Sequence, residues 1–200
     1  MQYVGDIVRA KYVGKHLLEG KGKCLDAGCG ANLYTGLVEG KGYQWYGIDV
    51  NSIPPAVYGS VTEIPFEDEF FDVVLCVDVL EHVGKDFVAV KEMFRVLKPG
   101  GVLVLHTPNS CQTHILADFP DNPAHVRKGY TDFELTTLLE QAGFCKAEVH
   151  PTFNVLEAIL WELWNLLRID MAMLERLANF ELDNYKNLGW LCVSRKDTNG

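Results

Sequence analysis

A short apolar segment that runs into a glycine-rich turn constrains the fold of this chain more than any other feature. The segment is Lys23-Cys24-Leu25-Asp26, and the turn Ala27-Gly28-Cys29-Gly30 follows it directly. Glycine has no Cβ and tolerates positive φ, so the backbone of such a turn can approach a small ligand closely. The pattern is typical of a strand that ends at a ligand site and leads into a helix.

Apolar segments of strand length alternate with segments of helical periodicity along the rest of the chain. We predict strands at residues 23–26, 43–50, 56–58, 71–77, 102–106, 144–150 and 188–193. Helices are predicted at residues 3–19, 33–38 and 85–97, the last of them ended by the turn Lys98-Pro99-Gly100-Gly101. A further helix is expected between Thr131, which forms a capping box with Glu134, and Gly143. The alternation predicts an α/β fold with a doubly wound, mostly parallel, seven-stranded sheet.

The length of the chain, 200 residues, allows one domain with an elaboration. We expect a single domain over residues 1–200, with an N-terminal helix at 1–21 and a ligand-binding core at 22–150. Helical spacing of apolar residues predicts an insertion at 154–183, and the last strand follows at 187–195. Ligands of doubly wound sheets bind outside the carboxyl ends of the strands, which is where Asp26 to Gly30 and Asp49 fall.

Composition argues against several classes of protein. The formal net charge of -9 is unlike that of a dedicated nucleic-acid or anionic-membrane binder. The N-terminus has no signal-peptide pattern, and the most apolar window, 155–167, is interrupted by Glu157, Glu162 and Asn165. The six cysteines lack the spacing of a zinc site or a disulfide framework. We therefore expect a cytoplasmic protein with no metal, no nucleic-acid partner and no stable membrane insertion.

Two nucleotide-like ligands compete for the glycine-rich turn. The dinucleotide fingerprint needs a third glycine, and Leu33 stands in its place. S-adenosylmethionine carries no phosphate, but its ribose diol requires an acceptor, and an acid at the end of the second strand can provide one. Asp49 lies about 20 residues beyond the glycines, the spacing expected for a ribose-binding acid. Asp49 alone is equally consistent with a solvated turn carboxylate.

The chain resembles the class I S-adenosylmethionine-dependent methyltransferases, most closely the subgroup with quinone, sugar and other small-molecule methyltransferases. The resemblance covers roughly residues 22 to 150. It rests on an ordered set of blocks: Leu25 to Gly30, Tyr46 to Asp49, Ile64 to Phe66 with Phe70 to Asp72, Asp78 to Val83, Leu97 to Gly101, and Thr107 to Asn109. It implies a Rossmann-like methyltransferase fold. The helical stretch from Leu156 to Phe180 departs from the family pattern and is expected as an added segment before the last strand.

The resemblance also implies roles for individual residues. Gly28 and Gly30 would approach the methionine part of the cofactor, and Asp49 would hold the ribose hydroxyls. Adenine would lie between Ser60 and Val61. The predicted cofactor-binding set is completed by Asp26, Cys29, Val50 and Val77. Asn32 stands where many members of the family have a third glycine.

The acceptor chemistry is less constrained by the sequence. Methyl transfer from a sulfonium is an in-line displacement that needs positioning, and a general base only if the acceptor must lose a proton. His82 and His125 are the candidate catalytic residues, because both fall near the predicted site. His82 is equally consistent with a structural or cofactor-shaping role, and His125 with a solvated position on the long segment from Thr107 to Tyr130.

The predicted function is therefore methylation of an oxygen, nitrogen or carbon atom of a small molecule, with S-adenosylhomocysteine as the second product. The alternatives are a catalytically silent cofactor-binding partner subunit and, disfavoured by Leu33, an NAD-dependent oxidoreductase. Apolar positions between Leu156 and Phe180, with Trp161 and Trp164 among them, are too numerous for one buried stripe. They predict added core, a homodimer face or an apolar lid over the acceptor.

Overall fold

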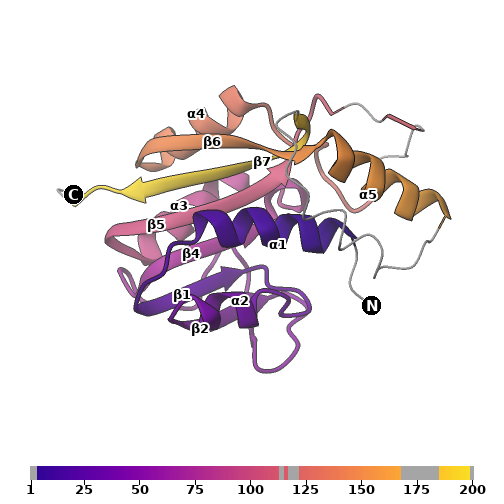
Figure 1. Ribbon diagram of the computed structural model, residues 1–200. Coiled ribbons are helices and arrows are strands. Elements are labelled where there is room, and N and C mark those ends of the chain that lie inside the picture. The colour runs from indigo at the N-terminus through magenta and orange to yellow at the C-terminus, as the bar shows by residue number, and fades with distance from the viewer. Residues whose placement is uncertain (1–3, 113–114, 117–121, 168–184, 199–200) are drawn as a thin grey trace.

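The computed structural model describes residues 4–112, 115–116, 122–167 and 185–198. One seven-stranded sheet with the order β3-β2-β1-β4-β5-β7-β6 runs through it (Figure 1). All neighbouring strands are parallel except β7, which is antiparallel to both β5 and β6. The strands are β1 (Gly22–Ala27), β2 (Tyr43–Asp49), β3 (Val57–Tyr58), β4 (Phe71–Val77), β5 (Leu97–Pro108), β6 (Phe144–Asn154) and β7 (Tyr185–Lys196). The predicted mostly parallel α/β sheet is confirmed.

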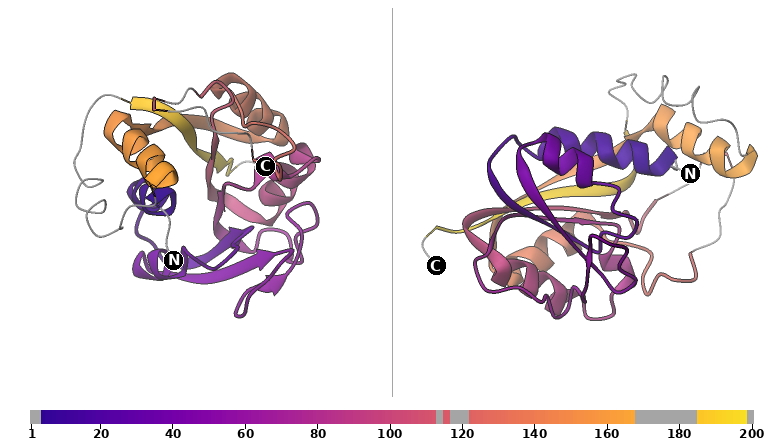
Figure 2. Two further views of the ribbon diagram at one scale, coloured as in Figure 1. Left: turned by 90° about the vertical axis from the view of Figure 1, so that its right-hand side faces the viewer. Right: turned by 90° about the horizontal axis from the view of Figure 1, so that it is seen from below.

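Helices cover both faces of this sheet. One face carries α1 (Val4–His16), α2 (Thr35–Gly40) and α5 (Val155–Leu167), whose apolar residues share one buried cluster. The other face carries α3 (Asp86–Val96) and α4 (Asp132–Ala142). The end-on view in Figure 2 separates the two layers, with α1 and α5 on one side of the sheet. A 3-10 turn, η1 (Leu80–His82), follows β4 at the carboxyl edge of the sheet.

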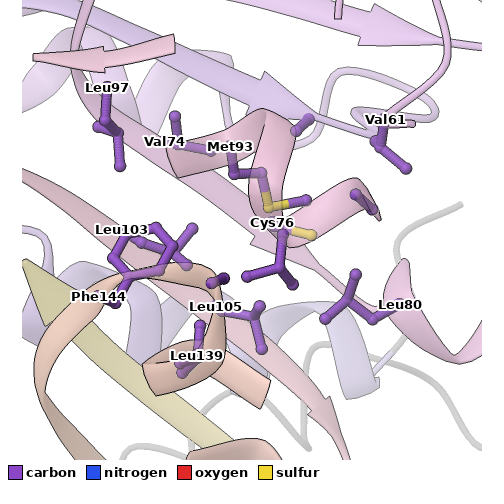
Figure 3. Close-up of a cluster of buried hydrophobic side chains, with 14 of the residues drawn as sticks. Val61, Val74, Cys76, Leu80, Met93, Leu97, Leu103, Leu105, Leu139 and Phe144 are labelled. Atoms are coloured by element: carbon purple, nitrogen blue, oxygen red, sulfur yellow. The ribbon is translucent and has the colours of Figure 1, made fainter. Parts of the chain in front are cut away.

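The larger core cluster explains why the central strands read as continuous apolar runs. Val74 and Cys76 of β4 and Leu103 and Leu105 of β5 are fully buried beneath Met93 of α3. Figure 3 shows these side chains together with Leu139 and Phe144. Because the opposite face of β4 is covered by the α1 layer, the strand is buried on both sides, as parallel strands of α/β proteins usually are.

The capping box predicted at the start of α4 is present. The backbone N–H of Glu134 donates to Thr131 Oγ1 at 3.2 Å, and the N–H of Thr131 donates to Glu134 Oε2 at 2.8 Å. The helix ends at Gly143, which has a left-handed φ of 106°. These local signals predict both ends of α4 correctly, because capping depends only on residues within one turn.

Helix α3 ends at Val96, so the predicted end of the helix before Lys98 to Gly101 is confirmed, whereas the next strand begins earlier than predicted. Strand β5 begins at Leu97, directly after α3, and includes all four of these residues. Phe71 pairs with Leu97 and Val73 pairs with Val102, so the extra residues of β5 are absorbed in a bulge. Gly100 lies in the bulge with φ 79°, a conformation that a non-glycine residue rarely adopts. In the described residues, none of positions 98–101 pairs with β4 or β7, so the proline and the glycines interrupt the regular pairing of β5.

The predicted helical insertion begins where expected. Helix α5 spans Val155–Leu167, and the rest of the predicted insertion, residues 168–184, lies outside the described residues. Strands β6 and β7 are longer than predicted and pair with each other as far as Asn154 and Tyr185. Among the helices that the structure describes, none is long and apolar enough to cross a membrane.

The first testable prediction concerns Gly28, which has φ 81° and at which an added Cβ would lie 2.5 Å from Val79 Cγ2. We expect Gly28→Ala to lower the free energy of unfolding by about 2–4 kcal/mol, because it adds both backbone strain and a clash. Gly36→Ala in α2 is the matched control: nothing lies within 4 Å of its Cβ position, so a gain of about 0.5–1 kcal/mol is expected. Urea denaturation measures the free energy of unfolding of both variants, and an equal change in the two would contradict the prediction.

Candidate cofactor and acceptor site

The turn after β1 is held against the end of β2 by hydrogen bonds. The backbone N–H groups of Gly28 and Cys29 donate to the carbonyl of Ile48 at 2.8 and 3.0 Å. The N–H of Gly30 donates to Asp49 Oδ2 at 2.9 Å. Gly30 and Asn32 have φ values of 50° and 61°, and asparagine is among the few side chains that tolerate this region. Asn32 therefore replaces a third glycine without changing the backbone that the turn requires.

Asp49 lies at the end of β2, with both carboxylate oxygens already engaged. Oδ2 accepts from Gly30, and Oδ1 accepts from the backbone N–H of Asn51 at 2.7 Å. Each carboxylate oxygen has two acceptor positions, so each retains one that a ligand hydroxyl can use. The two backbone hydrogen bonds fix the orientation of the carboxylate, as a site for a diol requires.

A cavity of about 780 Å³ opens over this turn at the carboxyl edge of the sheet. It brings together six of the predicted cofactor-binding residues and one predicted catalytic residue, His82. The lining residues are Gly28, Gly30, Asp49, Val50, Asn51, Gly59, Ser60, Val61, Thr62, Asp78, Val79, His82, Val83, Gly84 and Lys85. The volume of the site fits a nucleoside-containing ligand. Nothing lies within 4 Å of the Cβ position of Gly30, so the backbone there is open to such a ligand, whereas Val79 already occupies the corresponding space at Gly28.

Three predicted cofactor-binding residues do not line the cavity. Asp26 is fully buried beneath the turn, where Trp45 Nε1 donates to its carboxylate at 3.2 Å. Burial, together with the nearby charge of Asp49, raises the pKa of Asp26 to about 7. Cys29 is buried, and Val77 packs against the cluster on the α1 face of the sheet. Their contribution to the site is support of the turn and of the strand end.

Asp78 is the most prominent residue of the cavity that the sequence did not single out. It follows β4 with φ 52° and forms an ion pair with Arg9 of α1. Its Oδ1 accepts from Nδ1 of the buried His106 at 2.6 Å. Burial alone would raise the pKa of Asp78, but Arg9 and His106 outweigh it and hold the pKa at about 2. Asp78 is therefore an ionised carboxylate in the cavity wall.

His82 and His125 meet at the acceptor side of the cavity. The two rings are perpendicular, with centroids 4.6 Å apart, although His125 itself is not among the lining residues. His82 Nδ1 lies 3.0 Å from the carbonyl oxygen of Ala124. Because a carbonyl can only accept, Nδ1 carries the proton and Nε2 keeps a lone pair. The hydrogen bond therefore orients the His82 ring with Nε2 as the nitrogen that can accept a proton.

Glu81 lies beside these histidines and is fully buried. Burial and the charge of Asp78 raise its pKa to about 8, and Thr107 Oγ1 donates to it at 3.3 Å. Ligand atoms of Glu81, His82 and His125 all lie within 4.8 Å of one another. Donors around one zinc ion lie only about 3.3 Å apart, so a metal would require these side chains to move closer. The absence of a metal from the mechanism stays a prediction.

The segment between β5 and α4 and the insertion helix α5 are tied together above the site. The N–H groups of Val126 and Arg127 donate to the carbonyl of Glu81 at 2.8 and 3.3 Å. Those of Ile115 and Leu116 donate to the buried carboxylate of Glu162 at 2.6 and 2.5 Å. These bonds place α5 beside the long segment, a position that the sequence pattern left open.

Glu157, the other buried acid of α5, joins the insertion to α1. It accepts from Tyr12 Oη at 2.8 Å and pairs with Lys11 Nζ at 3.0 Å. Leu160 is buried in the same interface, whereas Leu166 is 47% exposed. Much of the apolar surface of α5 is therefore added core. The Trp164 side chain and residues 168–184 lie outside the described part of the structure, so the homodimer stays a prediction.

Comparison with known proteins agrees with this geometry. A family model described as a methyltransferase domain matches residues 25–105. A "probable S-adenosylmethionine-dependent methyltransferase" of Mycolicibacterium smegmatis is 37% identical over 142 residues, which are 66% of this chain and 54% of that protein. The chain thus spans about half the length of the curated relatives it matches.

Solved structures share the fold at low sequence identity. A SAM-dependent methyltransferase from Archaeoglobus fulgidus aligns with a TM-score of 0.71 and 20% identity, covering 96% of this chain and 94% of that one. A 1,6-didemethyltoxoflavin-N1-methyltransferase from Burkholderia thailandensis was solved with S-adenosylhomocysteine. It aligns with a TM-score of 0.61 and 19% identity, covering 96% of this chain and 78% of that one. The predicted Rossmann-like methyltransferase fold is confirmed.

The second prediction tests the buried acid beneath the turn. Because the native pKa of Asp26 is about 7 and the ordinary value 3.8, the folded state keeps a proton that the unfolded chain loses as the pH rises. Asp26 should therefore make wild type less stable between about pH 4 and 7, by up to about 4 kcal/mol. Asp26→Asn lacks this proton, so its stability relative to wild type should increase over that interval.

Urea denaturation at several pH values measures this difference, in which the other titrating groups largely cancel. Glu67→Gln removes an exposed acid and serves as the control, with a nearly constant difference from wild type. An Asp26→Asn difference that is equally flat from pH 4 to 8 would show that Asp26 titrates normally.

Proposed function

The chain belongs to the class I S-adenosylmethionine-dependent methyltransferases, and we propose that it methylates a hydroxyl or another proton-bearing heteroatom of a small molecule. The observation that carries this proposal is the orientation of His82, which donates from Nδ1 to the carbonyl of Ala124 and lines the same cavity as Asp49. A family member that only bound its cofactor would have no need for an oriented proton acceptor there.

The first half of the proposal is that S-adenosylmethionine binds at the glycine-rich turn, the end of β2 and the residues after β3. S-adenosylmethionine, when bound, supplies a methyl group on a sulfonium, which needs no further activation of its leaving group. Gly28 and Gly30 have no side chains, so the backbone of the turn can contact the cofactor directly. Asp49 accepts hydrogen bonds from the ribose hydroxyls. Ser60 and Val61 contact the adenine. The ionised carboxylate of Asp78 favours a ligand with positive charge.

The acceptor half assigns His82 as the general base. Its Nε2 takes the proton of the attacking hydroxyl, and His125 restricts the His82 ring through the perpendicular contact. Val126 and Arg127, held by hydrogen bonds to the carbonyl of Glu81, help to exclude water from the acceptor side of the cavity. Ile115 and Leu116, held by Glu162, link α5 to the same part of the chain. Exclusion of water and fixed orientation are the main contributions that a protein makes to methyl transfer.

The third prediction tests the cofactor half by calorimetric titration with S-adenosylhomocysteine. We expect Asp49→Ala to weaken binding about 10- to 100-fold, because it removes two hydrogen bonds to an ionised acceptor. Glu67→Ala removes an exposed acid of the same charge and should bind as wild type does. Absence of binding by wild type, or equal binding by both variants, would reject the cofactor assignment.

The fourth prediction tests the acceptor half with an untargeted screen, so the acceptor need not be known in advance. Wild type is incubated with metabolite extracts and S-adenosylmethionine, and mass spectrometry detects compounds that gain one methyl group. For such a compound, we expect His82→Gln to lower the rate about 10²- to 10⁴-fold while S-adenosylhomocysteine affinity changes less than about twofold. An unchanged rate would indicate an acceptor that needs no base.

The same screen distinguishes a catalytic methyltransferase from the alternative, a catalytically silent partner subunit. That alternative predicts tight binding of S-adenosylhomocysteine by wild type and no methylated product in any extract. Retained binding without turnover would therefore overturn the catalytic proposal and leave the family assignment intact.

A further inference from the structure

A second cavity lies at the opposite edge of the sheet from the cofactor site. It has a volume of about 220 Å³ and is lined by Lys15, His16, Leu18, Lys146, Glu148, Val193 and Arg195. Arg195 of β7 pairs with Val102 near the start of β5, whereas Asp78 and His82 follow the end of β4. In Figure 1 the arrowhead of β7 points to the side opposite that of β5, so the two cavities are at different ends of the strands.

Positive charge is concentrated in this cavity although the chain as a whole carries a net charge of -9. Lys15, Lys146 and Arg195 converge from α1, β6 and β7, and Glu148 is the one acidic lining residue. Among the residues that the structure describes, no carboxylate lies within ion-pairing distance of these three cations. Three uncompensated cations in one cavity of an acidic chain favour an anionic ligand.

Two histidines lie next to each other at this cavity. The rings of His16 and His150 lie 4.5 Å apart, and His150 Nε2 is 3.8 Å from Glu148. Burial lowers the pKa of His150, and the charges of His16 and Lys15 lower it further against the opposing effect of Glu148. The His150 imidazole therefore reports the local potential: a bound anion will favour its protonated form.

The backbone of β6 is distorted where it contributes its lysine. Cys145 pairs with Arg195 and Glu148 pairs with Val193, so β6 has one residue more than β7 in this interval. Lys146 lies in this bulge with φ 53°, a left-handed conformation that is costly for a residue with a Cβ. Bulges redirect side chains, and this one brings Lys146 to the same cavity as Lys15 and Arg195.

We propose that this cavity binds the phosphate group of a small molecule, at a site separate from the cofactor cavity. Arg195 supplies a planar fork of donors that matches two phosphate oxygens, and Lys15 and Lys146 supply compact positive charges. The volume accommodates a phosphate or diphosphate group with little beyond it. Glu148 is the one acidic lining residue and opposes anion binding, so the phosphate is expected on the side of the cavity formed by the three cations.

The fifth prediction uses pyrophosphate and inorganic phosphate as probes of the wild-type chain, followed by NMR. Pyrophosphate should shift the amide signals of residues 15–16, 145–148 and 195, and raise the pKa of His150. Its affinity should fall about tenfold in Lys146→Gly, which also relieves the backbone strain, and about tenfold in Arg195→Ala. Lys91→Ala, on α3 at the other face of the sheet, removes one charge elsewhere and should bind as wild type does.

Several outcomes would overturn the site. Equal affinity in wild type and both cavity variants would reject it, and so would shifts confined to Asp49 and Ser60. Binding of long polyanions without binding of pyrophosphate would assign the surface to a macromolecule instead. Because S-adenosylhomocysteine binding is measured separately, failure here leaves the methyltransferase proposal untouched, and Lys146→Gly gives an answer even if Arg195→Ala does not fold.

Discussion

The hydrogen bonds between the turn after β1 and the carbonyl of Ile48 determine the rest of the cofactor site. Strands β1 and β2 are parallel and in register up to Ala27 and Ile48, so the turn leaves β1 where β2 ends. Gly28 and Cys29 donate to one carbonyl, and the next donor, Gly30, reaches Asp49. A shift of one residue would move every side chain of the strand to the opposite face and separate the acid from the glycines.

The carboxylates around this turn differ in protonation because their surroundings differ. Asp26 and Glu81 are buried without a cationic partner, which raises their pKa values to about 7 and about 8. Asp78 has Arg9 and His106 beside it, and its pKa falls to about 2. The edge of the sheet therefore holds fixed negative charge where the cavity opens and neutral acids beneath it. That arrangement suits a cationic ligand, and it needs no uncompensated buried charge.

The features that the sequence predicted are those whose causes are local. The glycine-rich turn and the capping box of α4 each depend on residues a few positions apart. Asp49 lies 19 positions beyond Gly30 and was found from the characteristic spacing of a ribose-binding acid and from the family resemblance. Partners distant in sequence were missed: Asp78 and His106 are 28 positions apart, and Ile115 and Glu162 are 47 apart. No periodicity in the sequence signals such pairs.

The two acids that interrupt the apolar insertion helix illustrate why the missed pairs matter. A buried carboxylate in an apolar helix is costly unless donors satisfy it. Glu157 obtains its donors from Tyr12 and Lys11, and Glu162 obtains them from the backbone at Ile115 and Leu116. Helix α5 can therefore dock in only one place, between α1 and the long segment. The same acids that interrupt its apolar pattern in the sequence fix the register of α5 against α1 and against Ile115 and Leu116, because apolar contacts alone would allow the helix to slide.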